Sequence, residues 1–399
     1  MKPALYRVLM GSLALALALS LGGAALAQED DAAIPGTGLI TGPAEGEARN
    51  LTGTGATFPN PLYERWIEIA YTPLTGVQVN YQPTGSSAGI RGATDGSVNF
   101  GGSDAIMTDE QLAAAPGGPI LHIPAALGGV VPTYNIPELD DEALNFTPET
   151  LCLVFLGEAG RTSDREPIIR WNDPRLVADN PALAEIDRYI VVVHRAEGSG
   201  TTEIFTNYLT AVCPDWAEQV GAGPAVNWPT GIGARGNAGV AGNIAQTPYT
   251  IGYVEQAYAA TNQLPSAAVQ NREGNFVRAS QETISLAAAG FDLPDDMRIK
   301  LIDAEGENAY PISGLTWLLV YENQTDPEIA LALARFLWWA THDGQQFIID
   351  NADDPIIGGY APLPLPAIQK AEQLILRINV DGVQALPTEL AEAAMPADE

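Results

Sequence analysis

The sequence predicts an α/β protein with two mainly parallel β-sheets, and three observations lead to this fold class. Short apolar runs typical of strands alternate with stretches whose apolar residues recur at helical spacing, which favours parallel sheets joined by helices. The chain has 399 residues, 46% of them hydrophobic, enough for a sizeable core and for about two domains. The 40 Gly and 30 Pro follow no regular period, which excludes a collagen-like architecture.

The N-terminus is typical of a secretory signal peptide. Lys2 and Arg7 precede an apolar run, Val8 to Leu21, and Ala25-Leu26-Ala27 provides an A-x-A cleavage site. We expect residues 1–27 to be removed after Ala27, which would place the protein in the periplasm. An uncleaved anchor helix is the alternative, because the apolar stretch nearly spans a bilayer.

The two ends of the remaining chain are acidic and poor in large apolar residues. Residues 28–49 are rich in Gly and Pro without periodicity, so we expect a flexible leader. Residues 385–399 form an acidic tail. Compact sequence is expected between them.

The predicted elements follow in order along that compact part. A helix is expected after Pro61, because Leu62, Trp66, Ile69 and Ala70 fall at helical spacing. A second, strongly amphipathic helix is expected over 328–341. Apolar or alternating runs predict strands at 77–81, 128–134, 189–194, 251–254 and 316–321.

The charge balance excludes one class of partner. The chain has 19 basic and 49 acidic residues, a net charge of −30. A nucleic acid or an anionic membrane needs clustered Lys and Arg to neutralise its own charge. We therefore expect no nucleic-acid partner.

Cys152 and Cys213 are the only cysteines, and an oxidising compartment favours one disulfide between them. Two separately buried thiols are the alternative. The bridge would close a loop of 61 residues (213 − 152), which the chain-entropy treatment values at roughly 4 kcal/mol. His122, His194 and His342 are scattered without ligand spacing, so we expect neither a metal site nor a cofactor.

Three segments combine a strand, a loop of Gly, Ser and Thr, and a helix: 53–58, 85–90 and 195–202. Free N–H groups and hydroxyls at a helix N-terminus favour an anion. A plain turn with an N-cap would also explain the first two loops. In the third, Arg195 adds a forked donor that Glu197 could hold in place, and Ser199, Gly200 and Thr201 add hydroxyls and amides.

Asp104 lies in a fourth loop, 99–105, among Gly and Ser. An aspartate in such a loop is usually a turn or N-cap residue. Beside an anion site it would discriminate between anions, because a carboxylate accepts a proton from phosphate and repels fully ionised sulfate.

With these segments assembled, the sequence resembles the periplasmic phosphate-binding proteins of high-affinity phosphate ABC importers. The resemblance covers about 51–346 and rests on GTGATFPNP (53–61), GSSAG (85–89), FGGSDA (100–105), HRAEGSGT (194–201), WPTGIGARGNAG (228–239), IGYVE (251–255) and YPIS (310–313). Thr84 and Ala88 depart from the small or glycine residues expected there. The cysteine pair and the strong acidity are also not features of the family.

The resemblance implies a two-lobed periplasmic-binding-protein fold of type II, with mixed, mainly parallel sheets flanked by helices and a ligand cleft between the lobes. Lobe I would comprise 50–124 and 309–384, and lobe II 125–308. It implies that inorganic phosphate binds without catalysis, and that a monomer closes by hinge motion and docks on a membrane permease. Glu197 would orient Arg195, and the phosphate would contact Thr57, Phe58, Ser86, Asp104, Arg195, Ser199, Gly200 and Thr201.

Three other functions stay open at this point. A secreted phosphatase or serine hydrolase could use Ser199 or Ser86, but a G-x-S-x-G elbow around Ser199 would need glycines where Glu197 and Thr201 stand. A receptor for sulfate or molybdate is disfavoured by Asp104. A phosphate sensor or adhesin without a transporter would keep the same fold.

Overall fold

The computed structural model describes residues 34–139, 143–387 and 390. The expected signal peptide, its cleavage after Ala27 and nearly all of the acidic tail lie outside these residues. No helix in the described part of the chain is both long and apolar enough to cross a membrane.

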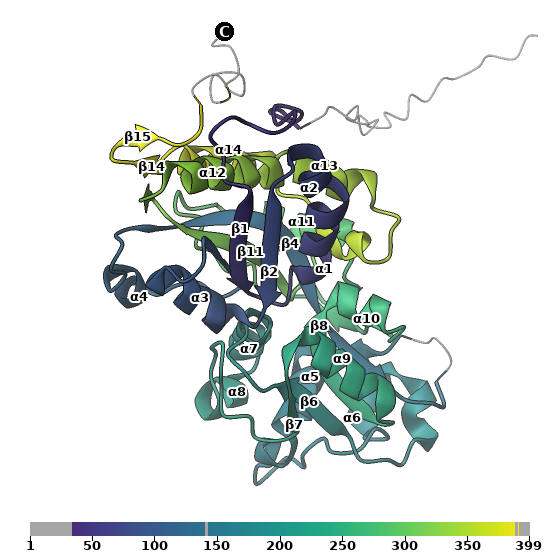
Figure 1. The fold of residues 1–399 in the computed structure, drawn as a ribbon. Coiled ribbons are helices and arrows are strands. Elements are labelled where there is room, and N and C mark those ends of the chain that lie inside the picture. The colour runs from purple at the N-terminus through teal and green to yellow at the C-terminus, as the bar shows by residue number, and fades with distance from the viewer. Residues whose placement is uncertain (1–33, 140–142, 388–389, 391–399) are drawn as a thin grey trace, which may run out of the picture. The chain divides into compact units, whose positions relative to one another are not determined.

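One strand, β4 (Ile120–Asn135), connects two sets of strands into a continuous path. The strand order is β2-β1-β3-β11-β4-β8-β6-β7, with β13 also paired to β4. Residues 120–129 of β4 pair antiparallel with β11, and residues 130–135 pair antiparallel with β8. The two sheets expected from the sequence are therefore joined through this strand, which passes from one lobe to the other (Figure 1).

Within each set, the remaining pairs are mostly parallel, because helical crossovers return the chain to the same end of the sheet. β1 is parallel to β2 and β3, and β6 is parallel to β7 and β8. The strand bounds are β1 Asn50–Gly55, β2 Gln78–Pro83, β3 Phe100–Ser103, β5 Asn145–Phe146, β6 Val191–Arg195, β7 Ile232–Ala234, β8 Thr250–Glu255, β9 Ala268–Gln270, β10 Phe276–Val277, β11 Ser313–Tyr321, β12 Asn323–Gln324, β13 Tyr360–Ala361, β14 Asn379–Val380 and β15 Val383–Gln384.

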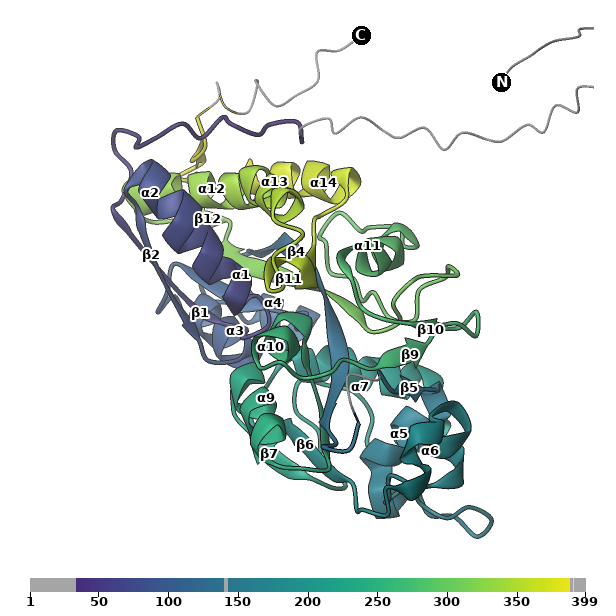
Figure 2. The same ribbon diagram turned by 90° about the vertical axis from the view of Figure 1, so that its right-hand side faces the viewer.

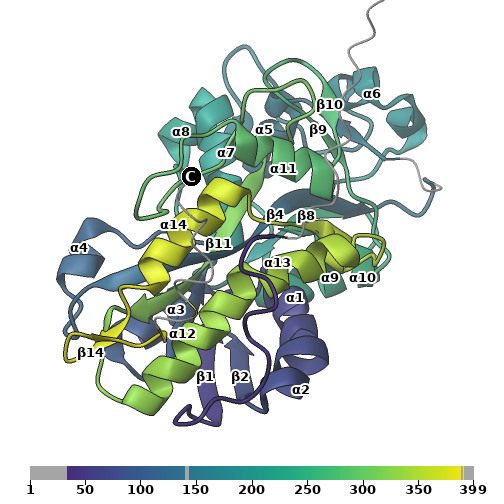
Figure 3. The ribbon, with the colours of Figure 1, turned by 90° about the horizontal axis from the view of Figure 1, so that it is seen from above.

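Helices cover the strands of both lobes. α3 packs against β1 and β3, and α9 packs against β8 and β6. α12, α13 and α14 lie together over the first lobe (Figures 2 and 3). The helix bounds are α1 Asn60–Arg65, α2 Thr72–Thr75, α3 Ser86–Asp95, α4 Asp109–Ala113, α5 Pro148–Leu156, α6 Pro174–Asp179, α7 Gly200–Val212, α8 Pro214–Gln219, α9 Gly236–Gln246, α10 Gln256–Thr261, α11 Gln281–Ala289, α12 Pro327–Thr341, α13 Asp343–Asp350 and α14 Leu365–Ile375, with 3₁₀ turns at Gly157–Gly160, Pro181–Glu185 and Ile357–Gly359.

The single helix expected after Pro61 is divided into α1, a π-helical segment at Trp66–Tyr71, and α2. Pro73 has no N–H to donate along an α-helix, which favours a change of hydrogen-bond pattern before it. The wider π turn also brings residues five apart to one face. Trp66 and Tyr71 both contact the ring of Trp339 in this way, so the irregular helix fits the core of the first lobe.

The described part of the expected leader, residues 34–49, is not free of the fold. Ile40 is buried, and Arg335 of α12 donates from Nε to Glu47 Oε2 at 2.8 Å. The Ala48 amide donates to the Glu328 carbonyl. An apolar anchor and a buried ion pair thus hold this segment, which composition alone did not predict.

The disulfide prediction is confirmed. Cys152 on α5 is bonded to Cys213, which follows α7, with a Cα–Cα distance of 6.4 Å. The bridge joins two helices of the second lobe across 61 positions of chain. The lobe boundaries at 124/125 and 308/309 stay predictions. The first boundary falls inside the continuous strand β4. Near the second, α11, which was assigned to lobe II, packs on β13 of lobe I and on β4.

Candidate functional site

Two helix N-termini from different lobes meet at the predicted loops. α3 begins at Ser86 and α7 begins at Gly200. The Gly200 amide donates to Ser86 Oγ at 2.9 Å, so the two tips are in direct contact. Both helices direct the positive ends of their dipoles to this point, which makes it favourable for negative charge.

Glycine at position 200 permits this contact. A Cβ atom there would lie 2.4 Å from Asp104 Cβ and 2.6 Å from Ser86 Oγ. Distances this short are not tolerated between non-bonded atoms, so any side chain would push the tip of α7 away. The contact between the lobes therefore depends on the missing side chain.

Asp104, just after β3, lies buried against these tips with 4% of its surface exposed. Ser86 Oγ donates to Asp104 Oδ2 at 3.2 Å, and the Asp104 amide donates to the same hydroxyl. Oδ1 is buried and has no hydrogen-bond partner among the described residues. Burial raises the pKa of Asp104 to about 7, against the opposing effects of the Thr316 hydroxyl and the Arg195 charge.

Arg195, at the end of β6, provides a buried positive charge that Glu197 holds in place. Its Nε donates to Glu197 Oε1 at 2.9 Å, and its Nη2 contacts the same oxygen. The Gly236 amide also donates to Oε1, at 2.9 Å. Although burial acts to raise it, the pKa of Glu197 is lowered because Arg195 stabilises the carboxylate. Arg195 Nη1 reaches Thr201 Oγ1 at 3.3 Å, so the guanidinium faces the tip of α7.

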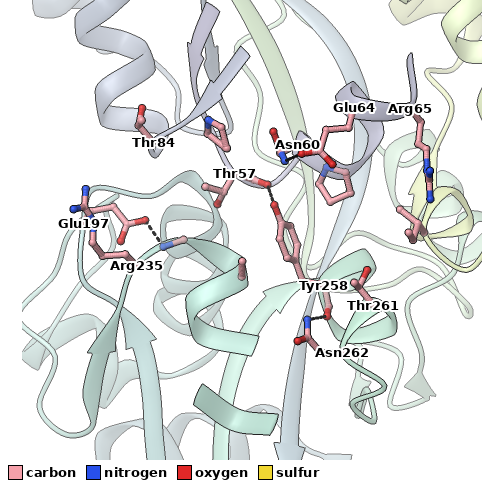
Figure 4. A pocket seen from close by; sticks show the side chains of 15 residues that line it. Thr57, Asn60, Glu64, Arg65, Thr84, Glu197, Arg235, Tyr258, Thr261 and Asn262 are labelled. Atoms are coloured by element: carbon pink, nitrogen blue, oxygen red, sulfur yellow. Dashed lines mark hydrogen bonds between the residues drawn. The ribbon is translucent and has the colours of Figure 1, made fainter. Parts of the chain in front are cut away.

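Thr57 and Phe58 lie in the loop between β1 and α1, held by tyrosines from other elements. Tyr258 donates to the Thr57 carbonyl at 2.6 Å, as Figure 4 shows, and Tyr360 donates to the Phe58 carbonyl at 2.7 Å. The Phe58 ring is buried, with its centroid 6.4 Å from that of Tyr360. No acceptor among the described residues takes the Phe58 amide proton.

Ser199 is the N-cap of α7, and its Oγ accepts from the Thr202 amide at 3.1 Å. A hydroxyl that accepts in this way still has its own proton to donate.

Hydrogen bonds join the predicted site residues in two groups. One group consists of Ser86, Asp104 and Gly200. The other consists of Arg195, Glu197 and Thr201.

Several residues of the site were missed by the sequence reasoning. Asn237 bonds to both Thr57 and Thr201, and Tyr258, Tyr360 and Glu255 support the Thr57–Phe58 loop and its surroundings. Asn237 and Glu255 do fall within motifs singled out above (228–239 and 251–255). Their partners come from distant segments, so no local spacing could assign them a role.

A groove of about 590 Å³ borders the buried site on one side (Figure 4). Thr57, Glu197 and Gly236 are among its lining residues, as are Arg65 and Arg235. The side chains of Arg65 and Arg235 have no carboxylate partner within 4.0 Å in the described part of the chain. Glu64 lines the groove as well and has no cationic partner among the described residues, so the lining beside Thr57 carries two unpaired positive charges and one unpaired negative charge.

This fold and this site define a two-lobed binding protein with a buried polar site where the lobes meet. Residues 41–343 match the PBP superfamily domain. The chain is 38% identical over 328 residues to the phosphate-binding protein PstS of Pasteurella multocida (82% of this chain, 90% of the relative). It is 40% identical over 324 residues to the protein of that name from Haemophilus influenzae (81% and 91%). The chain belongs to the PstS phosphate-binding proteins of the PBP superfamily.

Solved structures of similar proteins share the fold. A high-affinity periplasmic phosphate-binding protein (PfluDING) with bound phosphate has a TM-score of 0.64 at 21% identity, covering 81% of this chain and 93% of its own. A phosphate-binding protein from Stenotrophomonas maltophilia has a TM-score of 0.59 at 18% identity, covering 81% and 92%. The two-lobed α/β class predicted from the sequence is thereby confirmed, and the relatives are named as binding proteins.

Proposed function

We propose that this protein binds inorganic phosphate between its lobes, outside the cytoplasmic membrane, and delivers it to the permease of an ABC transporter. The names of the relatives support this role in phosphate transport. One observation carries the proposal: the unpartnered Oδ1 of buried Asp104 lies beside the Arg195 charge and the tips of α3 and α7.

Each predicted residue has a part in the proposed binding. Arg195, fixed by Glu197, pairs with the charge of the anion through a forked guanidinium. The other oxygens take protons from amides and hydroxyls of the surrounding loops, namely Thr57, Phe58, Ser86, Ser199, Gly200 and Thr201.

Asp104 determines which anion is accepted. Phosphate near neutral pH carries at least one proton, which the Asp104 carboxylate can accept. Sulfate carries none, so the carboxylate repels it. Burial raises the pKa of Asp104 in the ligand-free protein to about 7, so this carboxyl group can hold or release a proton near neutral pH.

Binding is coupled to closure in this proposal. The bond between Gly200 and Ser86 joins a second-lobe helix to a first-lobe helix, so a ligand held at both tips favours the closed form. The closed monomer then docks on the permease. Cleavage after Ala27 would release it into the periplasm, and neither nucleic-acid binding nor catalysis is part of the role.

Calorimetric titration with phosphate and with sulfate tests the proposal. The wild-type protein should bind phosphate tightly and sulfate far more weakly, with the sulfate affinity measured by its competition with phosphate. In Asp104→Asn, the ratio of phosphate to sulfate affinity should fall at least about tenfold, because the amide can donate to sulfate and no longer repels it. Asp95→Asn, at an exposed carboxylate on α3, is the matched control. An unchanged ratio in Asp104→Asn would refute the role of Asp104, and wild-type protein that ignores phosphate would refute the function.

A further inference from the structure

Asn237, near the start of α9, is fully buried between the two lobes. Its Oδ1 accepts from the Glu255 amide at 3.0 Å. This bond fixes the orientation of the side-chain amide, so Nδ2 must be the group that faces the opposite way. Nδ2 carries two protons to donate and accepts none.

Both protons of Nδ2 go to threonine hydroxyls of the site. Nδ2 lies 2.9 Å from Thr57 Oγ1 and 3.0 Å from Thr201 Oγ1. The Asn237 backbone amide adds a second donor to Thr57, at 3.3 Å, and Arg195 adds a second donor to Thr201. Each hydroxyl oxygen therefore accepts two hydrogen bonds.

A hydroxyl that accepts twice has only its proton left to offer. No acceptor among the described residues takes the proton of either Thr57 or Thr201, although both are buried. A buried donor without an acceptor is costly unless something else accepts its proton. The anion that we propose for this site is such an acceptor.

We infer that Asn237 is a positioning residue that turns the hydroxyls of Thr57 and Thr201 into donors for the bound anion, and does so only when the lobes are closed. The inference rests on the proposed function. Thr57 belongs to the loop after β1 and Thr201 to α7, so one amide spans both lobes. Opening of the cleft separates Asn237 from Thr57, and the Thr57 hydroxyl is then free to rotate.

The alternative is that Asn237 only stabilises the fold by satisfying the Glu255 amide. The two roles differ in what they do to ligand affinity. A purely structural role would lower the thermal midpoint of Asn237→Ala without a dependence on Thr57. A positioning role requires that Asn237 and Thr57 act on affinity through the same hydroxyl.

A double-mutant cycle on the full mature chain separates them, with inorganic phosphate as the probe and calorimetry as the readout. Asn237→Ala should weaken phosphate binding at least about 30-fold in the wild-type background. In the Thr57→Val background, the same substitution should weaken binding by less than one third of that factor. Asn243→Ala, at an exposed position of the same helix, is the control and should bind as wild type.

The inference would be overturned if Asn237→Ala weakened phosphate binding in the Thr57→Val background by one third or more of the factor found in the wild-type background. An Asn237→Ala variant that binds phosphate as tightly as wild type would overturn it as well. Asn237→Leu repeats the cycle with a larger side chain if the alanine variant does not fold. Thr57→Ser is tested with Asn237 unchanged. The serine hydroxyl keeps an oxygen that can accept from Asn237, so this variant should bind phosphate within about threefold of wild type. Binding as weak as that of Thr57→Val would count against the inference. Wild-type protein that does not bind phosphate would instead refute the proposed function.

Discussion

Among single residues, Asp104 is in an unusual environment for a carboxyl group. A carboxyl group buried to this extent is normally paired with a positive charge at hydrogen-bond distance. Here Oδ2 accepts a hydrogen bond from the Ser86 hydroxyl, and the Thr316 hydroxyl and the Arg195 charge offset the effect of burial on the pKa of Asp104 only in part. The protein thus keeps a carboxyl group that takes up or releases its proton near neutral pH, at the cost of stability.

That cost predicts a pH dependence of stability in the absence of ligand. The pKa of Asp104 is raised from 3.8 to about 7 on folding, so between these values the folded protein holds a proton that the unfolded chain releases. Stability should therefore fall as pH rises through this window, by at most about 1.4 kcal/mol per pH unit, and Asp104→Asn should lack this contribution.

Urea unfolding of both proteins at pH 5 and pH 8 checks this prediction. Glu255 also contributes, because burial and the charge of Asp104 raise its pKa. The difference between wild type and Asp104→Asn therefore reports Asp104 together with its coupling to Glu255. If the unfolding free energies of wild type and Asp104→Asn changed equally between pH 5 and pH 8, Asp104 would not be buried in the ligand-free protein.

At the level of elements, the tip of α7 is the part that must approach most closely. Gly200→Ala should weaken phosphate binding at least about 30-fold, because a Cβ would meet Asp104 and Ser86 and hold the helix away. Gly242→Ala in α9 is the control, because no atom lies within 4 Å of its Cβ position. That change should leave affinity intact and add about 0.5–1 kcal/mol of stability. Equal affinities in the two variants would contradict the close approach.

The disulfide acts on stability rather than on the site. Its removal in Cys152→Ala/Cys213→Ala should cost about 4 kcal/mol of unfolding free energy, since it closes a 61-residue loop. Phosphate affinity should stay unchanged, because Cys213 follows the far end of the 13-residue helix α7. Urea unfolding with and without reductant measures the effect. A variant as stable as the oxidised wild type would contradict it.

Strands and loops differ in how well local sequence predicts them. The buried runs at 251–254 and 316–321 correspond to β8 and β11, because apolar β-rich segments have few other places in an α/β fold. The site loops were found because Gly, Ser and Arg after a strand suit an anion. Pro73 favours a break in the helix after Pro61, but the contact of the π-helical segment with Trp339 and the anchoring of Glu47 by Arg335 involve partners far along the chain. No local sequence pattern contains these partners.

For the whole molecule, the net charge of −30 should slow the capture of an anion. The rate constant for phosphate association should rise severalfold between 10 and 150 mM salt, because the screening length shrinks from about 30 Å to about 8 Å. Stopped-flow measurement should find the dissociation rate constant nearly constant over this range. A fall in the association rate with salt would show that Arg65 and Arg235 of the groove outweigh the distant carboxylates.

The path of β4 limits how the proposed opening can happen. The strand changes partner from β11 to β8 beside Gly128 and Gly129, and it is hydrogen-bonded on both sides of that point. Neither half can slide along the other or detach while these ladders hold. Opening must therefore be a torsion of an intact ribbon, which returns the two halves to the same alignment after every cycle of release.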